Sequence, residues 1–398
     1  MAIASQRDRR ARAVTSAVFF AHATVFASWT PFIPTVKATM HASDAALGVA
    51  LLGPPIGSVG AMLVVGALIS RFGSAVLVRG CLAGYCAMPV LLGLAHSVAT
   101  VFAALAGWGA FQGGLDVAMN SQAGSVQRRY HRSIFASFHA CWSIGAVVGT
   151  GLGSLSVALG VALRWHLLGL GALTAIVVLP MTRGLLSDDD SAAGSRRRFA
   201  RPNRTLLVLG TIAFASLLGE GAAADWSAVY LRDGFAVPAG VAGLGYGAFT
   251  LLMFAGRVAG DRIIDSFGRR GAIRAGALLG GGSLGVALLI NTYPAGLLGF
   301  AGLGLGLSVV VPCVFGAATH LPGSPPGPSL ALVTTCGWAG FLCGPPLIGW
   351  LASVITLPGA LGVVAGVAIA MAVIAGGYRQ TPTSPGPRHG TRHGTGSR

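Results

Sequence analysis

Three polar residues, Gln112, Asp116 and Asn120, recur at four-residue intervals inside an apolar segment that runs from Val98 to Val126. On a helix this spacing places all three side chains on one side, where they form a polar stripe. A carboxylate in hydrocarbon costs about 3 kcal/mol or more even on lenient insertion scales. We therefore expect Asp116 to face a protein interior or a water-filled cavity. There a carboxyl group without a cation partner can lose its charge by binding a proton and regain it when water reaches it. The alternative is a structural acid that is hydrogen-bonded to Gln112 or to a neighbouring helix.

Two further acids lie deep in an apolar segment of the second half. Glu220 is the only glutamate in the chain. It lies about fifteen residues into its segment, which corresponds to roughly 22 Å along a helix. Asp225 follows five positions later and therefore points to a different face. We interpret Glu220 as a second proton-coupling candidate, and Asp225 either as a solute ligand or as a partner of Arg232 in an outer gate.

Aromatic residues accompany these polar groups. The indoles of Trp29, Trp142, Trp226 and Trp338 fall in the first, fifth, seventh and eleventh apolar segments. Aromatic faces combined with amide and acid groups suit a sugar or another small polar solute. For these tryptophans the alternative is the aromatic belt found at membrane interfaces. The single histidine His139 lies on an apolar helix and is either a solute ligand or a packed polar residue.

Composition requires a membrane setting for these residues. Hydrophobic residues make up 54% of the 398 residues and charged residues 10%, against roughly 25% charged in soluble proteins. Mean hydropathy is +0.73. The net charge of +16 comes from short basic clusters between long apolar runs, which is typical of a polytopic membrane protein and does not indicate a nucleic-acid partner. The six cysteines all fall inside apolar segments, so we expect small packing residues and no disulfides.

Catalytic motifs are missing from the sequence. We find no nucleophile motif, phosphate-binding loop or metal-spaced cluster, and the many glycines lack the strand-to-helix context of a nucleotide loop. We therefore expect neither an enzyme nor a cofactor.

The apolar segments predict an all-α polytopic membrane protein with twelve transmembrane helices, because about twenty apolar residues span a bilayer. The predicted spans are residues 12–36, 45–70, 75–95, 98–126, 133–159, 161–182, 205–231, 239–260, 271–291, 295–319, 329–354 and 358–378.

Basic residues orient these spans. Nearly all clustered arginines fall on one side if the N-terminus is cytoplasmic, and only Lys37, Arg164 and Arg232 remain for the outside. The positive-inside rule then predicts that both termini are cytoplasmic in the plasma membrane. The expected organisation is an N-terminal six-helix bundle at 1–182, a cytoplasmic linker at 183–204, a C-terminal six-helix bundle at 205–378 and a disordered cytoplasmic tail at 379–398.

The two halves resemble each other. A Leu-Gly pair in the second span leads to Arg71-Phe72-Gly73, and a Leu-Gly pair in the eighth span leads to Phe267-Gly268-Arg269-Arg270. The fifth and eleventh spans each place a tryptophan before glycines at close spacing, which lets helices approach closely. Two similar six-span halves indicate a transporter that binds its substrate between the halves, near the midplane of the membrane.

This layout and the two repeated loops resemble the major facilitator superfamily, whose loop pattern is Gly-x-x-x-Asp-Arg/Lys-x-Gly followed by basic residues. The first copy, 66–75, keeps Arg71 but has Ser70 in place of the aspartate. The second copy, 256–270, is charged throughout. In the family this loop latches the inner gate through a charge network. The resemblance therefore implies gate roles for Arg71 and, more strongly, for Asp261 paired with Arg257 or Arg262.

Within this superfamily, the segment from Asp116 to Asn120 resembles the fucose-permease type, in which an acid on the fourth span is followed four residues later by an asparagine. Drug–proton antiporters carry a Gly-Pro motif in the fifth span, which this chain lacks. We therefore expect a monomeric, proton-coupled transporter of a small polar solute. Its partners would be the solute, protons and the lipid bilayer. An efflux carrier for an amphipathic compound and a transporter-like membrane sensor are the alternatives.

Overall fold

The computed structural model describes residues 5–130, 134–187, 203–319, 321 and 326–376. Every regular element in this part of the chain is a helix, as predicted. Twelve helical segments among the described residues are long and apolar enough to cross a membrane, so the predicted number of spans is confirmed. Most of the predicted linker (188–202) and the whole predicted tail (379–398) lie outside the described residues.

The first bundle contains six membrane-spanning segments, several of which join a short helix to a longer one. They are α1 (Gln6–Trp29) with η1 (Thr30–Phe32) and α2 (Ile33–Thr39), α3 (Asp44–Ala50) with α4 (Gly53–Phe72), α5 (Ser74–Ala87) with η2 (Met88–Leu94), α6 (Val98–Tyr130), α7 (Phe135–Ala158), and α8 (Leu163–Met181) with η3 (Thr182–Gly184).

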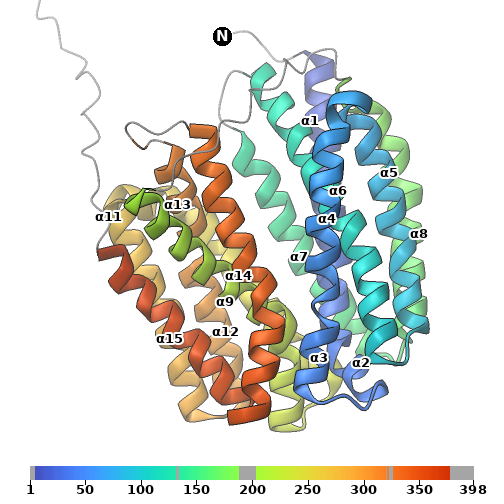
Figure 1. Ribbon diagram of the computed structural model, residues 1–398. Coiled ribbons are helices and arrows are strands. Elements are labelled where there is room, and N and C mark those ends of the chain that lie inside the picture. Colours follow the sequence, from blue (N-terminus) through green and yellow to red (C-terminus); the bar gives the residue numbers. More distant parts are fainter. Residues whose placement is uncertain (1–4, 131–133, 188–202, 320, 322–325, 377–398) are drawn as a thin grey trace, which may run out of the picture.

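The second bundle repeats this pattern and stands beside the first (Figure 1). It contains α9 (Arg204–Phe235), α10 (Ala239–Ala242) with the first part of α11 (Leu244–Ile290), the second part of α11, α12 (Tyr293–Leu307) with α13 (Val310–Thr319), α14 (Pro326–Ile355) and α15 (Leu357–Gly376).

Two glycines break the chain at matching places in the two halves. Gly73, between α4 and α5, has a φ of 80°, and Gly268, inside α11, has a φ of 65°. An L-residue with a side chain is strained in this region of backbone conformation, whereas glycine adopts it readily. Each glycine ends one span and starts the next. The shared conformation supports the internal repeat that the two Phe-Gly sequences predicted.

Close helix packing within each bundle depends on small residues. A side chain on Gly149 of α7 would collide with the carbonyl oxygen of Thr24 on α1, and a side chain on Gly340 of α14 would collide with that of Phe214 on α9. The glycines of the fifth and eleventh spans therefore let these helix pairs touch backbone to backbone, as expected for small residues in membrane helices.

The two bundles converge at the end where α2 and α3 lie and diverge towards the end marked N (Figure 1). We call these the Lys37 end and the Gln6 end. At the Lys37 end α3 contacts α14 and α2 contacts α9. A side chain on Gly48 would meet the carbonyl oxygen of Pro345 at 2.7 Å, so α3 and α14 approach through their backbones. The bundles are therefore closed against each other at this end.

Candidate functional site

The polar stripe of α6 is present as predicted. Gln112, Asp116 and Asn120 are all partly buried and lie one turn apart. The Asn120 side-chain amide donates to the Asp116 carboxylate at 3.2 Å and to the Asp116 backbone carbonyl at 2.8 Å. No cation pairs with Asp116 among the described residues. Its carboxylate is therefore held by one amide, with no opposite charge to offset the cost of burying it.

Gln112 and Asp225 face the same small cavity between the two bundles. The cavity has a volume of about 20 Å³, which is enough for a single water molecule. The side-chain oxygen of Gln112 is buried and accepts no hydrogen bond from the described residues. The wall consists of aromatic rings, prolines and one leucine: Phe26, Trp29, Leu51, Pro54, Pro55, Trp108, Phe341 and Pro345. An amide and a carboxyl group thus meet within an aromatic enclosure.

Asp225 has no hydrogen-bond or ion-pair partner in the part of the chain that the structure describes. Arg232, which we considered as its partner, instead donates to the hydroxyl group of Thr35 at 3.2 Å. The predicted pairing of Asp225 with Arg232 is therefore wrong. Asp225 lies in the wall of the cavity, whereas Arg232 lies two turns farther along α9, at the Lys37 end. Among the described residues, neither Asp225, in the cavity wall, nor Asp116, one turn along α6 from the cavity residue Gln112, has a cation partner.

Glu220 and Arg257 form an ion pair in the same region as Asp225. The nearest carboxylate oxygen and guanidinium nitrogen are 3.8 Å apart, and their side chains are 16% and 23% exposed. The Arg257 guanidinium also donates to the Ser143 hydroxyl at 3.0 Å. The other oxygen of Glu220 is buried without a hydrogen bond from any described residue. One arginine on α11 thus links α9 of its own bundle to α7 of the other.

The structure thus places Arg257 at Glu220 and Ser143, and the gate role that the loop pattern implied for Arg257 stays a prediction. Arg257 lies one and a half helical turns before Arg262, so the helix carries its side chain away from the loop and towards Glu220. The side chain of Asp261 lies outside the described residues. Arg262 is exposed, and the exposed Arg71 stacks its guanidinium over the Phe72 ring, 5.2 Å from the centroid. A latch between Asp261 and Arg262 stays a prediction.

Two more polar residues surround the Glu220–Arg257 pair. The buried Tyr246 lies close enough to Glu220, Asp225 and Arg257 to interact electrostatically with each. His139 lies one turn before Ser143, within electrostatic range of Arg257. The His139 side chain is exposed, and its ring centroid is 5.3 Å from that of Phe19. The two bundles thus share a cluster of charged and polar groups.

The four predicted tryptophans take different positions. Trp29 lines the small cavity, and the Trp338 ring packs edge-on against the cavity residue Phe341 with centroids 5.7 Å apart. The Trp142 indole donates to the Nδ1 atom of His22 at 3.1 Å. Trp226 is fully buried in the helix core and is not part of the cavity wall. Trp29 therefore lines the cavity, and Trp338 packs against a phenylalanine ring that lines it.

Sequence reasoning missed several residues of this region. Trp108 lies four residues before Gln112, on the same face as the polar stripe, and Phe26 lies three residues before Trp29. Helical spacing from the predicted residues could have found both. Ser143 and Tyr246 carry no such signal, because each is a single polar residue on an apolar helix.

A second set of charged residues joins the bundles at the Lys37 end. The Lys37 ammonium group is 2.6 Å from the Asp44 carboxylate and 2.6 Å from the Asp233 carboxylate. Asp44 begins α3 in the first bundle, whereas Asp233 lies near the end of α9 in the second. Lys37 is the only lysine in the chain. It therefore bridges the bundles at the end where they are closed.

Comparison with known proteins gives the family. A family model described as Major Facilitator Superfamily matches residues 15–327. A transporter of Yersinia pestis described as an uncharacterized MFS-type transporter is 36% identical over 359 residues, which cover 88% of this chain and 91% of that protein. The membrane protein MosC of Rhizobium meliloti is 33% identical over 347 residues, covering 86% and 84%.

The fold comparison agrees with this result. The crystal structure of a mutant of the nucleoside transporter NupG superposes with a TM-score of 0.76 at 13% identity, covering 93% of this chain and 100% of that chain. At this low sequence identity, the match shows only that the two proteins share a fold. The family model and the sequence relatives carry the assignment: the chain belongs to the major facilitator superfamily and is a membrane transporter, not an enzyme.

Proposed function

We propose that the protein is a proton-coupled secondary transporter that moves a small polar solute by alternating access. The observation that carries this proposal is a pair of acids without a cation partner among the described residues: Asp116, one helical turn along α6 from the cavity residue Gln112, and Asp225, in the cavity wall on the opposite bundle. A buried carboxylate without a counter-charge is costly, and in membrane proteins such groups mark proton and substrate pathways. We assign proton coupling to Asp116 and keep Glu220 as a second candidate.

The groups around the cavity suit a neutral or weakly charged polar solute, such as a sugar-like metabolite. Gln112 and Asp225 lie in the cavity wall among aromatic rings. Asn120 on α6 and His139 on α7 add an amide and an imidazole outside this wall. A ring-shaped polyol stacks its apolar face on aromatic side chains while its hydroxyl groups bond to amides and acids. Trp29, Trp142 and Trp338 are the proposed stacking residues. Trp226 is fully buried, which favours a packing role. The fucose-permease resemblance stays a prediction.

We further propose that the Gln6 end faces the cytoplasm and that this conformation is inward-facing. The arginine distribution supports this orientation through the positive-inside rule. The Lys37 end, closed by the Lys37 bridge and by the approach of Gly48 to Pro345, would then be extracellular. Alternating access would open this end as the two bundles rock about the central site. The protein would act as a monomer in the plasma membrane.

Uptake into proteoliposomes tests the proposed function. Purified protein is reconstituted and offered a panel of labelled sugars, polyols, nucleosides and small organic cations, with and without an inward proton gradient. We expect at least one neutral polar solute to accumulate only with the gradient, and a protonophore to abolish the accumulation. Liposomes without protein serve as the control.

Three other results would contradict this proposal. Binding of a solute without flux would favour the sensor alternative. Gradient-driven extrusion of amphipathic compounds, with no flux of polar solutes, would favour the efflux alternative. Equal accumulation with and without the proton gradient would exclude proton coupling.

The Lys37 bridge leads to a prediction about the gate. We expect Lys37→Gln and Asp233→Asn each to raise the rate at which a membrane-impermeant maleimide labels a cysteine placed at Leu51, on the cavity wall, in a background without native cysteines. Because Asp233 is 46% exposed, the bridge contributes up to about 1 kcal/mol, which corresponds to a roughly fivefold change in the open population.

The matched control is Arg164→Gln. Arg164 is a cation of the same end whose guanidinium stacks over Trp165 within the first bundle, 5.4 Å from the ring centroid. This variant should leave the labelling rate unchanged. Equal rates in the parent and both bridge variants would exclude a latch at Lys37.

A further inference from the structure

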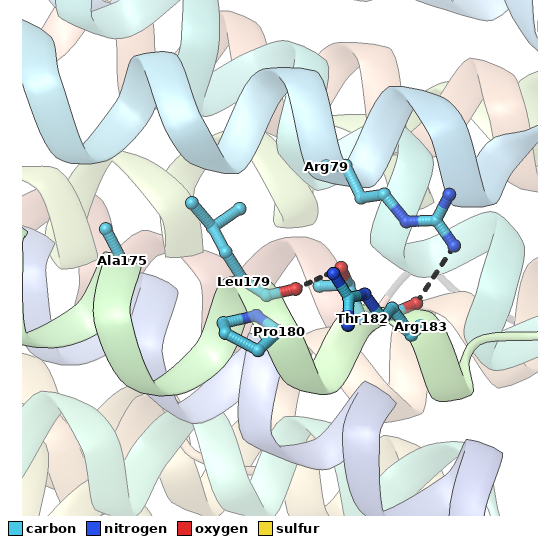
Figure 2. A pocket seen from close by; sticks show the side chains of 6 residues that line it. All are labelled: Arg79, Ala175, Leu179, Pro180, Thr182 and Arg183. Atoms are coloured by element: carbon cyan, nitrogen blue, oxygen red, sulfur yellow. Dashed lines mark hydrogen bonds between the residues drawn. The ribbon is translucent and has the colours of Figure 1, made fainter.

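A groove of about 470 Å³ lies on the side of the first bundle, between α5 and α8 near the Gln6 end. Figure 2 shows where the apolar and the basic residues lie in the groove. Ala175 lies at one end and the Arg79 guanidinium at the other, and the Arg183 guanidinium lies between them, beside Thr182 and Leu179. The groove therefore has an apolar part at the Ala175 end and a cationic part that contains Arg79 and Arg183.

The cationic part has unused hydrogen-bond donors. Arg79 donates one guanidinium N–H to the backbone carbonyl of Thr182 at 3.2 Å, which leaves its remaining donors available. Arg183 is exposed and has no hydrogen-bond or ion-pair partner in the part of the chain that the structure describes. Two guanidinium groups with free donors favour an oxyanion such as a phosphate, which accepts several N–H groups at once.

More positive charge lies next to the groove. The Arg10 side chain packs against Gly184, directly after Arg183, and Arg7 donates to the Ser187 hydroxyl at 3.0 Å. The one acid on α1, Asp8, already accepts hydrogen bonds from the Ser5 backbone N–H and hydroxyl and pairs with Arg129 at 3.4 Å. The described residues thus leave the groove without a carboxylate of its own.

The apolar part opens towards lipid. Exposed apolar side chains flank it on both helices: Val76 is 51% exposed, Leu173 59% and Ile176 73%. In a membrane transporter such side chains contact the hydrocarbon of the bilayer. A free phosphate ion would find no partner in this part of the groove, whereas the acyl chain of a lipid would pack along it.

We propose that this groove binds an anionic phospholipid of the cytoplasmic leaflet. Its phosphate would lie between Arg79 and Arg183, and the start of one acyl chain would lie against Ala175 and Leu179. Basic pockets between transmembrane helices on the cytoplasmic side are the type of site that binds anionic headgroups. The choice of the cytoplasmic leaflet rests on the proposed orientation of the Gln6 end, whereas nothing in the proposal depends on which solute the protein transports.

Native mass spectrometry of the full-length protein tests the site. Protein in mild detergent is titrated with phosphatidylglycerol, cardiolipin or phosphatidylcholine, and bound lipids are counted. We expect the parent to retain at least one anionic lipid in preference to phosphatidylcholine. In the Arg79→Gln/Arg183→Gln variant the affinity for that lipid should fall roughly tenfold or more. The control is Arg71→Gln/Arg262→Gln, two exposed arginines outside the groove, which should bind as the parent does.

Each remaining outcome overturns the proposal. Equal binding of phosphatidylcholine would show that charge does not select the occupant. An equal loss in the control variant would assign the effect to the general positive charge of this end. Displacement of the lipid by millimolar inorganic phosphate would indicate an anion site without a lipid role.

Discussion

Replacing Asp116 by asparagine is expected to abolish proton-driven accumulation while solute exchange across the membrane continues. The Asp116 carboxylate accepts a hydrogen bond from Asn120 at 3.2 Å and has no cation partner among the described residues. Its charge must be neutralised before the carrier can reorient at low cost, and a proton can do this. Asparagine is neutral at every pH, so the variant should reorient without taking up a proton.

The accumulation ratio measures this effect. If one proton moves with each solute, an inward gradient of about one pH unit supports roughly tenfold accumulation. We expect the parent to approach this ratio and Asp116→Asn to reach about onefold, with counterflow exchange retained. Asp265→Asn, which neutralises an exposed acid of α11, should behave as the parent does.

Two results would reassign or exclude this role. If Asp116→Asn accumulates solute as well as the parent, Asp116 is a structural acid held by Asn120. If Asp225→Asn loses accumulation and Asp116→Asn does not, the proton binds at Asp225, where the cavity of Gln112 provides room for one water molecule.

Much of the fold could be predicted because its determinants are local. The span predicted at 98–126 corresponds to α6, Val98–Tyr130, and that at 358–378 to α15, Leu357–Gly376. Apolar run length fixes such segments, and glycine marks their breaks, as Gly73 and Gly268 show. The boundaries shifted where polar residues extend a helix beyond the apolar run, as at the end of α6.

The site was only partly predictable, because its pairs join distant helices. The stripe of Gln112 and Asp116 followed from spacing within one helix. The contact of Arg257 with Glu220 requires α9 and α11 to pack together. The sequence of neither helix predicts this packing. Arg257 is also part of the loop pattern at 256–270, so the sequence alone predicts a gate role for it. The pairing of Lys37 with Asp233 likewise could not be predicted, because the two residues are far apart in the sequence.

The Glu220–Arg257 pair leads to the second large effect. Glu220→Gln and Arg257→Gln are each expected to lower transport by about 10- to 100-fold, because Glu220 is the proposed second proton site and Arg257 is its cation partner. Loss of an interaction with a charged group costs about 1.5–3 kcal/mol. Each variant also leaves one largely buried charge without its partner, which destabilises a protein by about 3–5 kcal/mol in typical cases. The measurements are solute flux in proteoliposomes and the melting temperature of the purified protein.

The double variant Glu220→Gln/Arg257→Gln separates binding from folding. It removes both charges, so its melting temperature should exceed that of either single variant, which is the non-additivity expected of a direct pair. Its transport should stay low, because the proposed second proton site at Glu220 is then gone. Ser143→Ala keeps the pair and removes only the 3.0 Å bond between the bundles. It should alter the transport rate but preserve the melting temperature. If the double variant instead regains full transport along with its stability, the pair only supports the fold, and Glu220 is not a proton site.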